Sequence, residues 1–272
     1  MSGLHPFDRA IALEPLGEDR FAGRTDPAWA NRVGPYGGIT AATLLNAAWL
    51  HPRRLGEPVS LTVHYAAPVA DGAFEVHARA VRTNRSTQHW WIVLQQDGAV
   101  AATATALFAI RRTTWAAPER PMPAVPAAVA VPPAAPRTAV AWPARYQLRF
   151  VEGGWPELDE AHPQPDSQTT VWIRDEPPRP LDACALASMI DCFYPRVYRR
   201  RQRLVPAGTV SMTTHFHAGA DALARQGAQP LLGCARGLRF ERGYFDQRAE
   251  LWGADGTLLA SGMQSVYFND GG

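Results

Sequence analysis

Asp191 is the residue of this 272-residue chain whose type and surroundings first suggest chemistry. It lies in segment 180–195, which is apolar almost throughout and predicts a buried helix. Pro180 and Asp182 suit the start of that helix, and Pro195 requires its end. A carboxylate in the last turn is disfavoured by the helix dipole, by about 0.3–1 kcal/mol, so Asp191 needs stabilising partners.

Two interpretations of Asp191 follow from the segment. The first is an ordinary residue at a helix edge, hydrogen-bonded to a neighbouring loop or paired with Arg196. The second is a general base, because burial raises the pKa of a carboxyl group toward neutral pH. The segment alone leaves both open.

Composition excludes several classes of function. All 27 basic residues are arginine, which excludes Schiff-base chemistry on lysine, and the net charge of +2 gives no nucleic-acid footprint. The three cysteines form no Cys-x-x-Cys pair and indicate free thiols in a reducing cytoplasm. Without a leader or a long apolar run, we expect a soluble, cytoplasmic protein with no membrane insertion.

Motifs for common catalytic groups are also missing. The sequence has no Gly-x-Ser-x-Gly elbow, no His-Glu-x-x-His and no Cys/His set at zinc spacing. We therefore expect neither a metal nor a cofactor.

The elements around Asp191 predict an α+β protein. Segment 39–50 is a small-residue apolar helix that begins after Gly37 and Gly38, which allow close backbone approach and leave amide hydrogens free at the helix start. One or two strands are expected within residues 4–25. Four longer strands are expected after the helix, at 59–67, 73–83, 88–96 and 100–111.

Segment 116–143 divides the chain. It holds eight prolines among many alanines and predicts an extended, semi-rigid linker between residues 1–115 and residues 144–272. Strands are expected in the second half at 146–151, 169–174, 208–217, 232–241, 247–252 and 257–268.

The two halves repeat one plan. Residues 59–65 and 210–216 share four identities in seven, and residues 97–103 resemble 255–261 in the same order along each half. Each half also places a small-residue helix before its long strands. The repetition predicts a duplicated fold.

These features together resemble the double hotdog proteins of the type II acyl-CoA thioesterase group. The resemblance implies a tandem hotdog, with each half an antiparallel sheet wrapped around a long helix and the two forming a pseudo-dimer with one continuous sheet. It also implies further assembly into a homo-oligomer. The family's catalytic Asp, Thr and Gln fall on Asp191, Thr209 and Gln264. Ser211, Thr213 and Thr214 lie close enough to compete with Thr209 for its place.

The repeat gives an internal control on this assignment. Aligning the halves sets Asn46 opposite Asp191, Pro58 opposite Thr209 and Ala106 opposite Gln264. A residue that the fold requires should appear in both halves, whereas a single active site needs it once. The comparison favours a catalytic Asp191.

The expected function is hydrolysis of acyl-CoA to a free acid and CoA by a water that the Asp, Thr and Gln orient. The backbone amides of Gly37 and Gly38 are candidates for binding the oxyanion or acyl group, although these glycines could equally serve only a tight turn. The alternative is a non-catalytic acyl-CoA or lipid-binding hotdog module. Convergence of the three side chains on one water would favour the enzyme.

An arginine-rich stretch follows the Asp191 helix. Arg196, Arg199 and Arg200 are candidates for the phosphates of CoA, because guanidinium groups bind phosphate in bidentate fashion. The alternative is a solvated face without a ligand.

Overall fold

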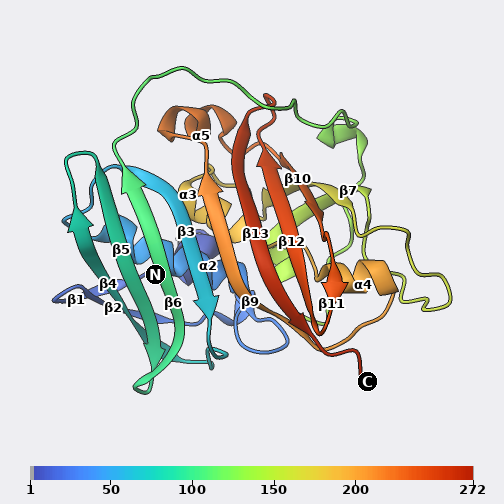
Figure 1. Cartoon of the computed structure of the whole chain (residues 1–272), viewed down its shortest axis with the longest axis horizontal. Coiled ribbons are helices and arrows are strands. Elements are labelled where there is room, and N and C mark those ends of the chain that lie inside the picture. Colours follow the sequence, from blue (N-terminus) through green and yellow to red (C-terminus); the bar gives the residue numbers. More distant parts are fainter. Residues whose placement is uncertain (1–2, 272) are drawn as a thin grey trace.

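The chain folds around one continuous antiparallel sheet of thirteen strands, seen in a computed structural model that describes residues 3–271. The first half contributes, in spatial order, β1 (Glu14–Gly17), β2 (Arg20–Arg24), β4 (Ala73–Thr83), β5 (Thr87–Gln96), β6 (Ala99–Ala109) and β3 (Glu57–Tyr65). The second half continues with β9 (Ala207–Phe216), β13 (Leu258–Phe268), β12 (Tyr244–Trp252), β10 (Leu231–Arg236), β8 (Thr169–Asp175) and β7 (Tyr146–Glu152). The short β11 (Phe240–Glu241) pairs with β12. Strands β3 and β9 join the halves at the centre (Figure 1).

The β3–β9 seam has the register of a twofold axis. Thr62 lies opposite Thr213, and their hydroxyl oxygens are 3.0 Å apart. Ser60 pairs with His215, and His64 pairs with Ser211. Since the repeat aligns the same residues, the strand order on one side of the seam corresponds to that on the other. The expected tandem hotdog is confirmed.

Two helices lie against one face of the sheet, behind it in Figure 1. Helix α2 (Gly37–Leu50) has 14 residues, whereas α3 (Ala183–Met189) has only 7. The expectation of a long helix therefore holds for the first half, and the second half has a short one. Asp182 starts α3, where its carboxylate accepts a hydrogen bond of 2.7 Å from the amide of Ala185.

The end of α3 corrects the predicted place of Asp191. The helix stops at Met189, and the Asp191 amide bonds the Ser188 carbonyl at 3.2 Å in a tighter turn. Asp191 thus follows the helix and does not belong to its last turn.

Three short helices have no counterpart in the sequence predictions. They are α1 (Pro6–Ala10), α4 (Arg196–Arg201) and α5 (Ala220–Gln226). Segment 4–25 therefore begins with a helix, ahead of β1 and β2. Single-turn 3₁₀ helices occur at Pro27–Trp29, Ala128–Ala130 and Trp142–Arg145.

Segment 116–143 is extended, and it is packed against the protein. Val131 is buried in a cluster with Trp172 and Trp252, and the Trp172 indole donates to the Pro126 carbonyl at 2.9 Å. Further on, the ring of Trp142 stacks on that of Tyr36 at 4.5 Å. The first part of the segment therefore packs on the surface of the second half, and its last part packs beside the start of α2.

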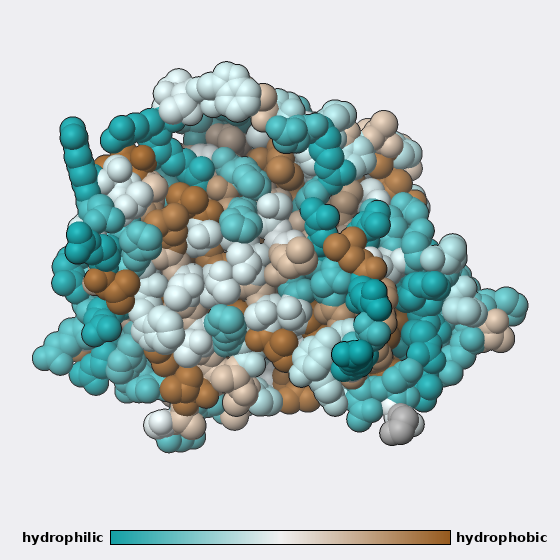
Figure 2. Space-filling model, in the orientation of Figure 1, coloured by the Kyte–Doolittle hydropathy of each residue, from teal (hydrophilic) through white to brown (hydrophobic). Residues whose placement is uncertain are grey.

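The core lies between the sheet and the helices. Every residue of α2 from Gly38 to Ala48 is buried, as are all residues of α3 after Ala183. The opposite face of the sheet, shown in Figure 2, mixes hydrophilic and hydrophobic residues. Among residues 3–271, no helix is long and apolar enough to cross a bilayer.

Candidate active site

Asp191, Thr209 and Gln264 lie together, joined by hydrogen bonds. The Gln264 side-chain amide donates to Asp191 Oδ1 at 2.8 Å, and the Thr209 hydroxyl donates to Gln264 Oε1 at 2.9 Å. The three residues come from the turn after α3, from β9 and from β13. The orientation of the Gln264 side-chain amide agrees with both hydrogen bonds, because its oxygen accepts one and its nitrogen donates the other.

A β-bulge places Thr209 on the correct face of the sheet. Ser211 pairs with Ser265 and Thr209 with Val266, so β9 has one extra residue, Val210, at this point. Without the bulge, strict alternation would turn Thr209 to the outer face together with Thr213. The equivalent bulge occurs in the first half, where Pro58 and Ser60 pair with consecutive residues of β6.

Burial raises the pKa of Asp191 to about 7. The hydrogen bond from Gln264 and the backbone N–H of Gly38 lower it by less than burial raises it. The nearby Tyr36 and Tyr65 hydroxyls have pKa values raised by burial and by the Asp191 charge, so they stay protonated at neutral pH. Asp191 can therefore exchange a proton near neutral pH.

The peptide unit between Gly37 and Gly38 is held from both sides. The Tyr65 hydroxyl donates to the Gly37 carbonyl at 2.9 Å, and the Gly38 N–H faces Asp191. A Cβ atom on Gly37 would lie 2.8 Å from Asp191 Oδ2, and one on Gly38 would lie 2.4 Å from the Ser188 carbonyl. Gly38 leaves no room for a Cβ atom against the backbone of α3, and a Cβ atom at Gly37 would displace the Asp191 carboxylate, because the start of α2 meets the end of α3 here.

The carboxylate faces a cavity of about 520 Å³ between the halves. Its polar inner lining includes Gly37, Asp191, Thr209 and Gln264. The rest is largely apolar and aromatic, from the start of α2, β3 and the loop after it, the linker segment, the loop after β7, the turn after α3, and α4. These wall residues include Tyr36, Tyr65, Val69, Val140, Trp142, Trp155, Phe193 and Tyr198. A cavity of this size and character suits an apolar chain with a polar end.

Arg196, a predicted phosphate ligand, is buried and does not line the cavity. Its side chain is 0% exposed, and its guanidinium donates to the carbonyls of Tyr194 and Ser167 and to the Thr169 hydroxyl. Nor does it pair with Asp191. It ties the start of α4 to strand β8, and burial lowers its pKa to about 10.

Of the other predicted site residues, one lines the cavity and the rest do not. Gly37 lines the cavity, whereas Gly38 does not, and its N–H is directed at Asp191. Arg199 and Arg200 also do not line this cavity. Arg200 donates to the Gln164 carbonyl and lines a separate cleft beyond α4.

Two site residues were missed from the sequence. Tyr65 positions the Gly37 carbonyl, and Gln247 lines the cavity beside Gln264, its partner in the β12–β13 register. The repeat held a signal for Tyr65, because its counterpart is Phe216 and the hydroxyl occurs in only one half. Gln247 gave no comparable signal.

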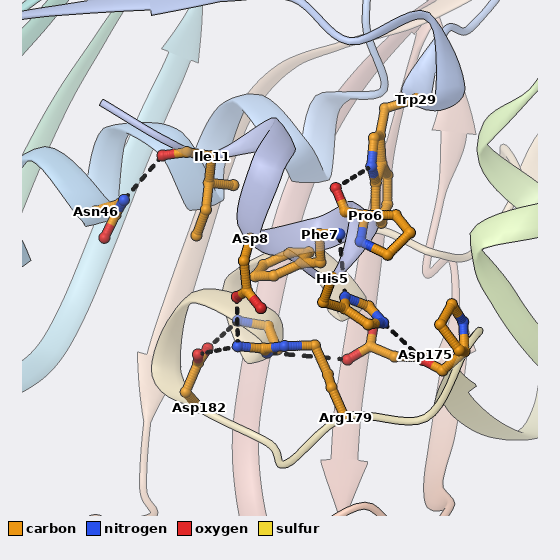
Figure 3. A network of polar contacts seen from close by, with 12 residues as sticks. His5, Pro6, Phe7, Asp8, Ile11, Trp29, Asn46, Asp175, Arg179 and Asp182 are labelled. Carbon is orange, nitrogen blue, oxygen red and sulfur yellow. Dashed lines mark hydrogen bonds and ion pairs between the residues drawn. The ribbon is translucent and has the colours of Figure 1, made fainter. Parts of the chain in front are cut away.

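The first half's equivalent of this site is filled by the chain itself (Figure 3). Asn46, the counterpart of Asp191, donates to the Ile11 carbonyl at 2.8 Å. In helix α1, Phe7 is completely buried and packs edge-on against Trp29. Nearby, Arg179 contacts Asp8 at 2.8 Å and Asp182 at 2.7 Å, which fastens α1 to the start of α3. The Asp191 position thus places a carboxylate at a cavity, whereas the equivalent position carries the Asn46 amide, bonded to the chain itself.

Comparisons with known proteins agree with this architecture. A family model described as the acyl-CoA thioesterase C-terminal domain matches residues 122–268, and one for the acyl-CoA thioesterase N-terminal domain matches residues 25–109. No curated protein sequence matches the chain.

Two solved structures illustrate the similarity. A conserved protein of unknown function with a hotdog fold from Alicyclobacillus acidocaldarius is 46% identical, with a TM-score of 0.93, over 98% of this chain and 99% of that one. An acyl-CoA thioesterase II from Mycobacterium marinum is 20% identical, with a TM-score of 0.74, over 97% of this chain and 98% of that one. The second likeness concerns the fold.

Proposed function

Because the chain belongs to the acyl-CoA thioesterase family and is a thioester hydrolase, we propose that it hydrolyses acyl-CoA through a water oriented by Asp191, Thr209 and Gln264. The observation that carries this proposal is the hydrogen-bonded series from Thr209 through Gln264 to Asp191 at the wall of the cavity. The carboxylate has a pKa near the working range of a general base.

In the proposed reaction, ionised Asp191 takes a proton from the water as its oxygen attacks the thioester carbonyl carbon. The resulting tetrahedral oxyanion is stabilised by the N–H of Gly37 at the start of α2. Collapse of this intermediate breaks the carbon–sulfur bond. The thiolate leaves with the proton that Asp191 had taken, and the acid and CoA are released.

Thr209 and Gln264 have positioning roles in this scheme. The Thr209 hydroxyl donates to Gln264, so its oxygen lone pairs can accept a hydrogen bond from the water. Gln264 in turn fixes one Asp191 oxygen and leaves Oδ2 for the proton. Holding water and base in one geometry removes much of the entropic cost of the attack.

A non-catalytic acyl-CoA or lipid-binding module is the alternative. Such a module needs the apolar cavity and gains nothing from an ionisable carboxylate at its wall, because burying a charge without a cationic partner is costly. The convergence of Asp191, Thr209 and Gln264 favours the enzyme.

The proposal extends to the setting of the enzyme. It places the chain in the cytoplasm, where acyl-CoA substrates occur and the free thiols of Cys184, Cys192 and Cys234 would stay reduced. It also includes assembly of several double hotdogs into a homo-oligomer.

The test is Asp191→Asn, assayed by release of free thiol from a panel of acyl-CoA chain lengths. We expect kcat to fall by about 10²–10⁴-fold, because the general base is lost while the hydrogen-bonding shape is kept. Circular dichroism should show an intact fold.

A matched control is Asp175→Asn. Asp175 is buried, and burial raises its pKa to about 7 as it does for Asp191, but Asp175 lies outside the cavity. It should retain near-normal kcat. Normal turnover by Asp191→Asn, or an equal loss in both variants, would remove the proposed mechanism.

A further inference from the structure

The cavity that holds Asp191 has two positive charges on its outer lining. Among residues 3–271, its charged lining residues are Asp191, Arg32 and Arg137. Asp191 lies on the inner wall with Thr209, whereas both arginines are exposed to solvent. A ligand whose apolar end enters the cavity would present its outer end to these guanidinium groups.

The loop that carries Arg32 is fixed. The Asn31 amide donates to the Gly34 carbonyl at 2.8 Å, and Ala30 bridges to Pro35. Gly34 has a φ of +66°, and a Cβ atom there would lie 2.5 Å from the Val69 carbonyl. The backbone of Arg32 is therefore held at the cavity mouth by a turn that only glycine can form.

The charge of Arg32 is free to bind an anion. In the described part of the chain, Arg32 makes no salt bridge, whereas Arg9, Arg53, Arg201 and Arg239 each pair with a carboxylate. Its charge acts across the mouth on Tyr198 of α4: burial raises the pKa of that hydroxyl, and Arg32 counteracts the rise.

Arg137 belongs to the linker segment beside the same loop. The amides of Ala141 and Trp142 both donate to the Ala30 carbonyl, at 3.0 and 3.3 Å, which holds the linker against the base of the Arg32 turn. The Arg137 guanidinium uses one N–H on the Pro156 carbonyl, at 3.0 Å. Its remaining N–H groups are available to a ligand.

The arginines after α3 point elsewhere. Arg201 contacts Asp270, and both Arg200 and Arg201 line the cleft beyond α4. The run of arginines that first suggested phosphate binding is thus separated from the Asp191 cavity by the helix on which it lies.

We propose that Arg32, assisted by Arg137, binds the phosphate next to the pantetheine arm of the thioester substrate. The inference rests on the proposed function. Acyl chain and pantetheine are uncharged and suit the cavity, and the phosphate is the first charged group outward from the thioester. Guanidinium binds phosphate in bidentate fashion, and a cationic mouth also raises the rate of encounter with an anionic substrate. The phosphate can belong to CoA or to a carrier protein.

The test is Arg32→Ala, assayed with acyl-CoA and with the same acyl group on pantetheine, which has no phosphate. We expect KM for acyl-CoA to rise about three- to tenfold, as for loss of one charge-assisted phosphate contact at an exposed site, with kcat unchanged. KM for the pantetheine thioester should stay as in the wild type. Arg200→Ala is the matched control and should leave both substrates unaffected.

An acyl phosphopantetheine thioester and an acylated carrier protein identify the source of the phosphate. In Arg32→Ala, KM for the phosphopantetheine thioester should rise as KM for acyl-CoA does. Of acyl-CoA and the acylated carrier protein, the substrate whose KM rises more is the natural source of the phosphate. Equal KM changes with and without phosphate, an unaffected phosphopantetheine ester, or a larger effect of Arg200→Ala would each overturn the inference. If wild-type protein hydrolysed none of the thioesters, the proposed function itself would fail.

Discussion

At the scale of single residues, the electrostatics of Asp191 govern the expected chemistry. Within residues 3–271, no arginine pairs with this carboxylate: Arg196, five positions later, is buried in a different polar cluster. Its neighbours are neutral donors, the Gln264 amide and the Gly38 N–H, surrounded by Tyr36, Tyr65, Tyr146 and the Cys192 thiol. Since burial outweighs these donors, the carboxyl holds its proton up to about pH 7.

This position of the pKa predicts a pH dependence of activity. An acid with a pKa of about 7 is the active base only when ionised, so kcat/KM should rise with pH and level off above about 7. Well below that pH the fall should approach about tenfold per unit. Initial rates of thiol release between pH 5 and 8.5 measure it. The Asp175→Asn variant should give the same profile, and a flat profile would contradict a titrating Asp191.

At the scale of elements, the site is made by the close meeting of two helix ends. The start of α2 reaches the end of α3 because Gly37 and Gly38 carry no side chains, and the Tyr36 hydroxyl donates to the Ser188 carbonyl at 2.7 Å. Strand β3 adds Tyr65, which fixes the Gly37 carbonyl. The first half thus supports a carboxylate that the second half provides.

Gly37→Ala tests this meeting of helix ends. The new methyl carbon would lie 2.8 Å from Asp191 Oδ2, so the carboxylate must shift, and kcat should fall by about 10²-fold. Alanine is favourable in a helix, so the free energy of unfolding should change by no more than about 1 kcal/mol. Denaturant titration and kinetics measure the two effects.

Gly208→Ala serves as the control for that change. Gly208 also lines the cavity, but a Cβ atom there has no heavy atom within 4 Å. Near-normal activity is expected. Full activity of Gly37→Ala would show that the close approach of α2 to Asp191 is dispensable.

At the scale of the whole molecule, the two halves differ at equivalent positions: Asp191 lies at a cavity, and the position of Asn46 is filled. The pseudo-twofold axis at Thr62 and Thr213 relates the Asp191 cavity to the position of Asn46, which α1 fills. Arg179 holds α1 in place through Asp8, and its guanidinium lies 4.0 Å from the buried Asp175. The N-terminal helix of the first half is thereby fixed to the second half.

This network predicts a pH-dependent stability effect of Arg179→Ala. Burial raises the pKa of Asp175 to about 7 and Arg179 lowers it, so above that pH the arginine compensates a buried charge. At pH 8 the variant should lose about 2–3 kcal/mol of unfolding free energy. At pH 5 Asp175 is protonated with or without Arg179, so the loss should be smaller.

Urea denaturation of wild type and variant at pH 5 and pH 8 measures the difference. Arg53→Ala is the control, because Arg53 is 61% exposed beside Asp19, a carboxylate that stays ionised over this range. Its effect should be small at both pH values. An Arg179→Ala penalty that is equal at pH 5 and pH 8 would contradict the role assigned to Asp175.

Much of the fold of this protein could be predicted from local sequence patterns. Alternation and turn residues located the long strands to within a few positions, since each strand buries one face whatever its partners are. The repeat of 59–65 in 210–216 predicted a duplicated fold, and the structure pairs these two strands with each other at equivalent residues. The family resemblance placed the expected catalytic set on Asp191, Thr209 and Gln264, comparison of the halves favoured Asp191, and the structure brings the three together.

The sequence by itself therefore determined the tandem plan and which half carries the polar residues. Only the tertiary structure decided that the Val210 bulge turns Thr209 toward Gln264, that Arg196 is buried, and that Arg32 lies at the cavity mouth. The physical reason is the distance along the chain between the residues that determine each feature. Periodicity reports which face of an element is buried, whereas each of these features depends on a contact between segments far apart in the chain.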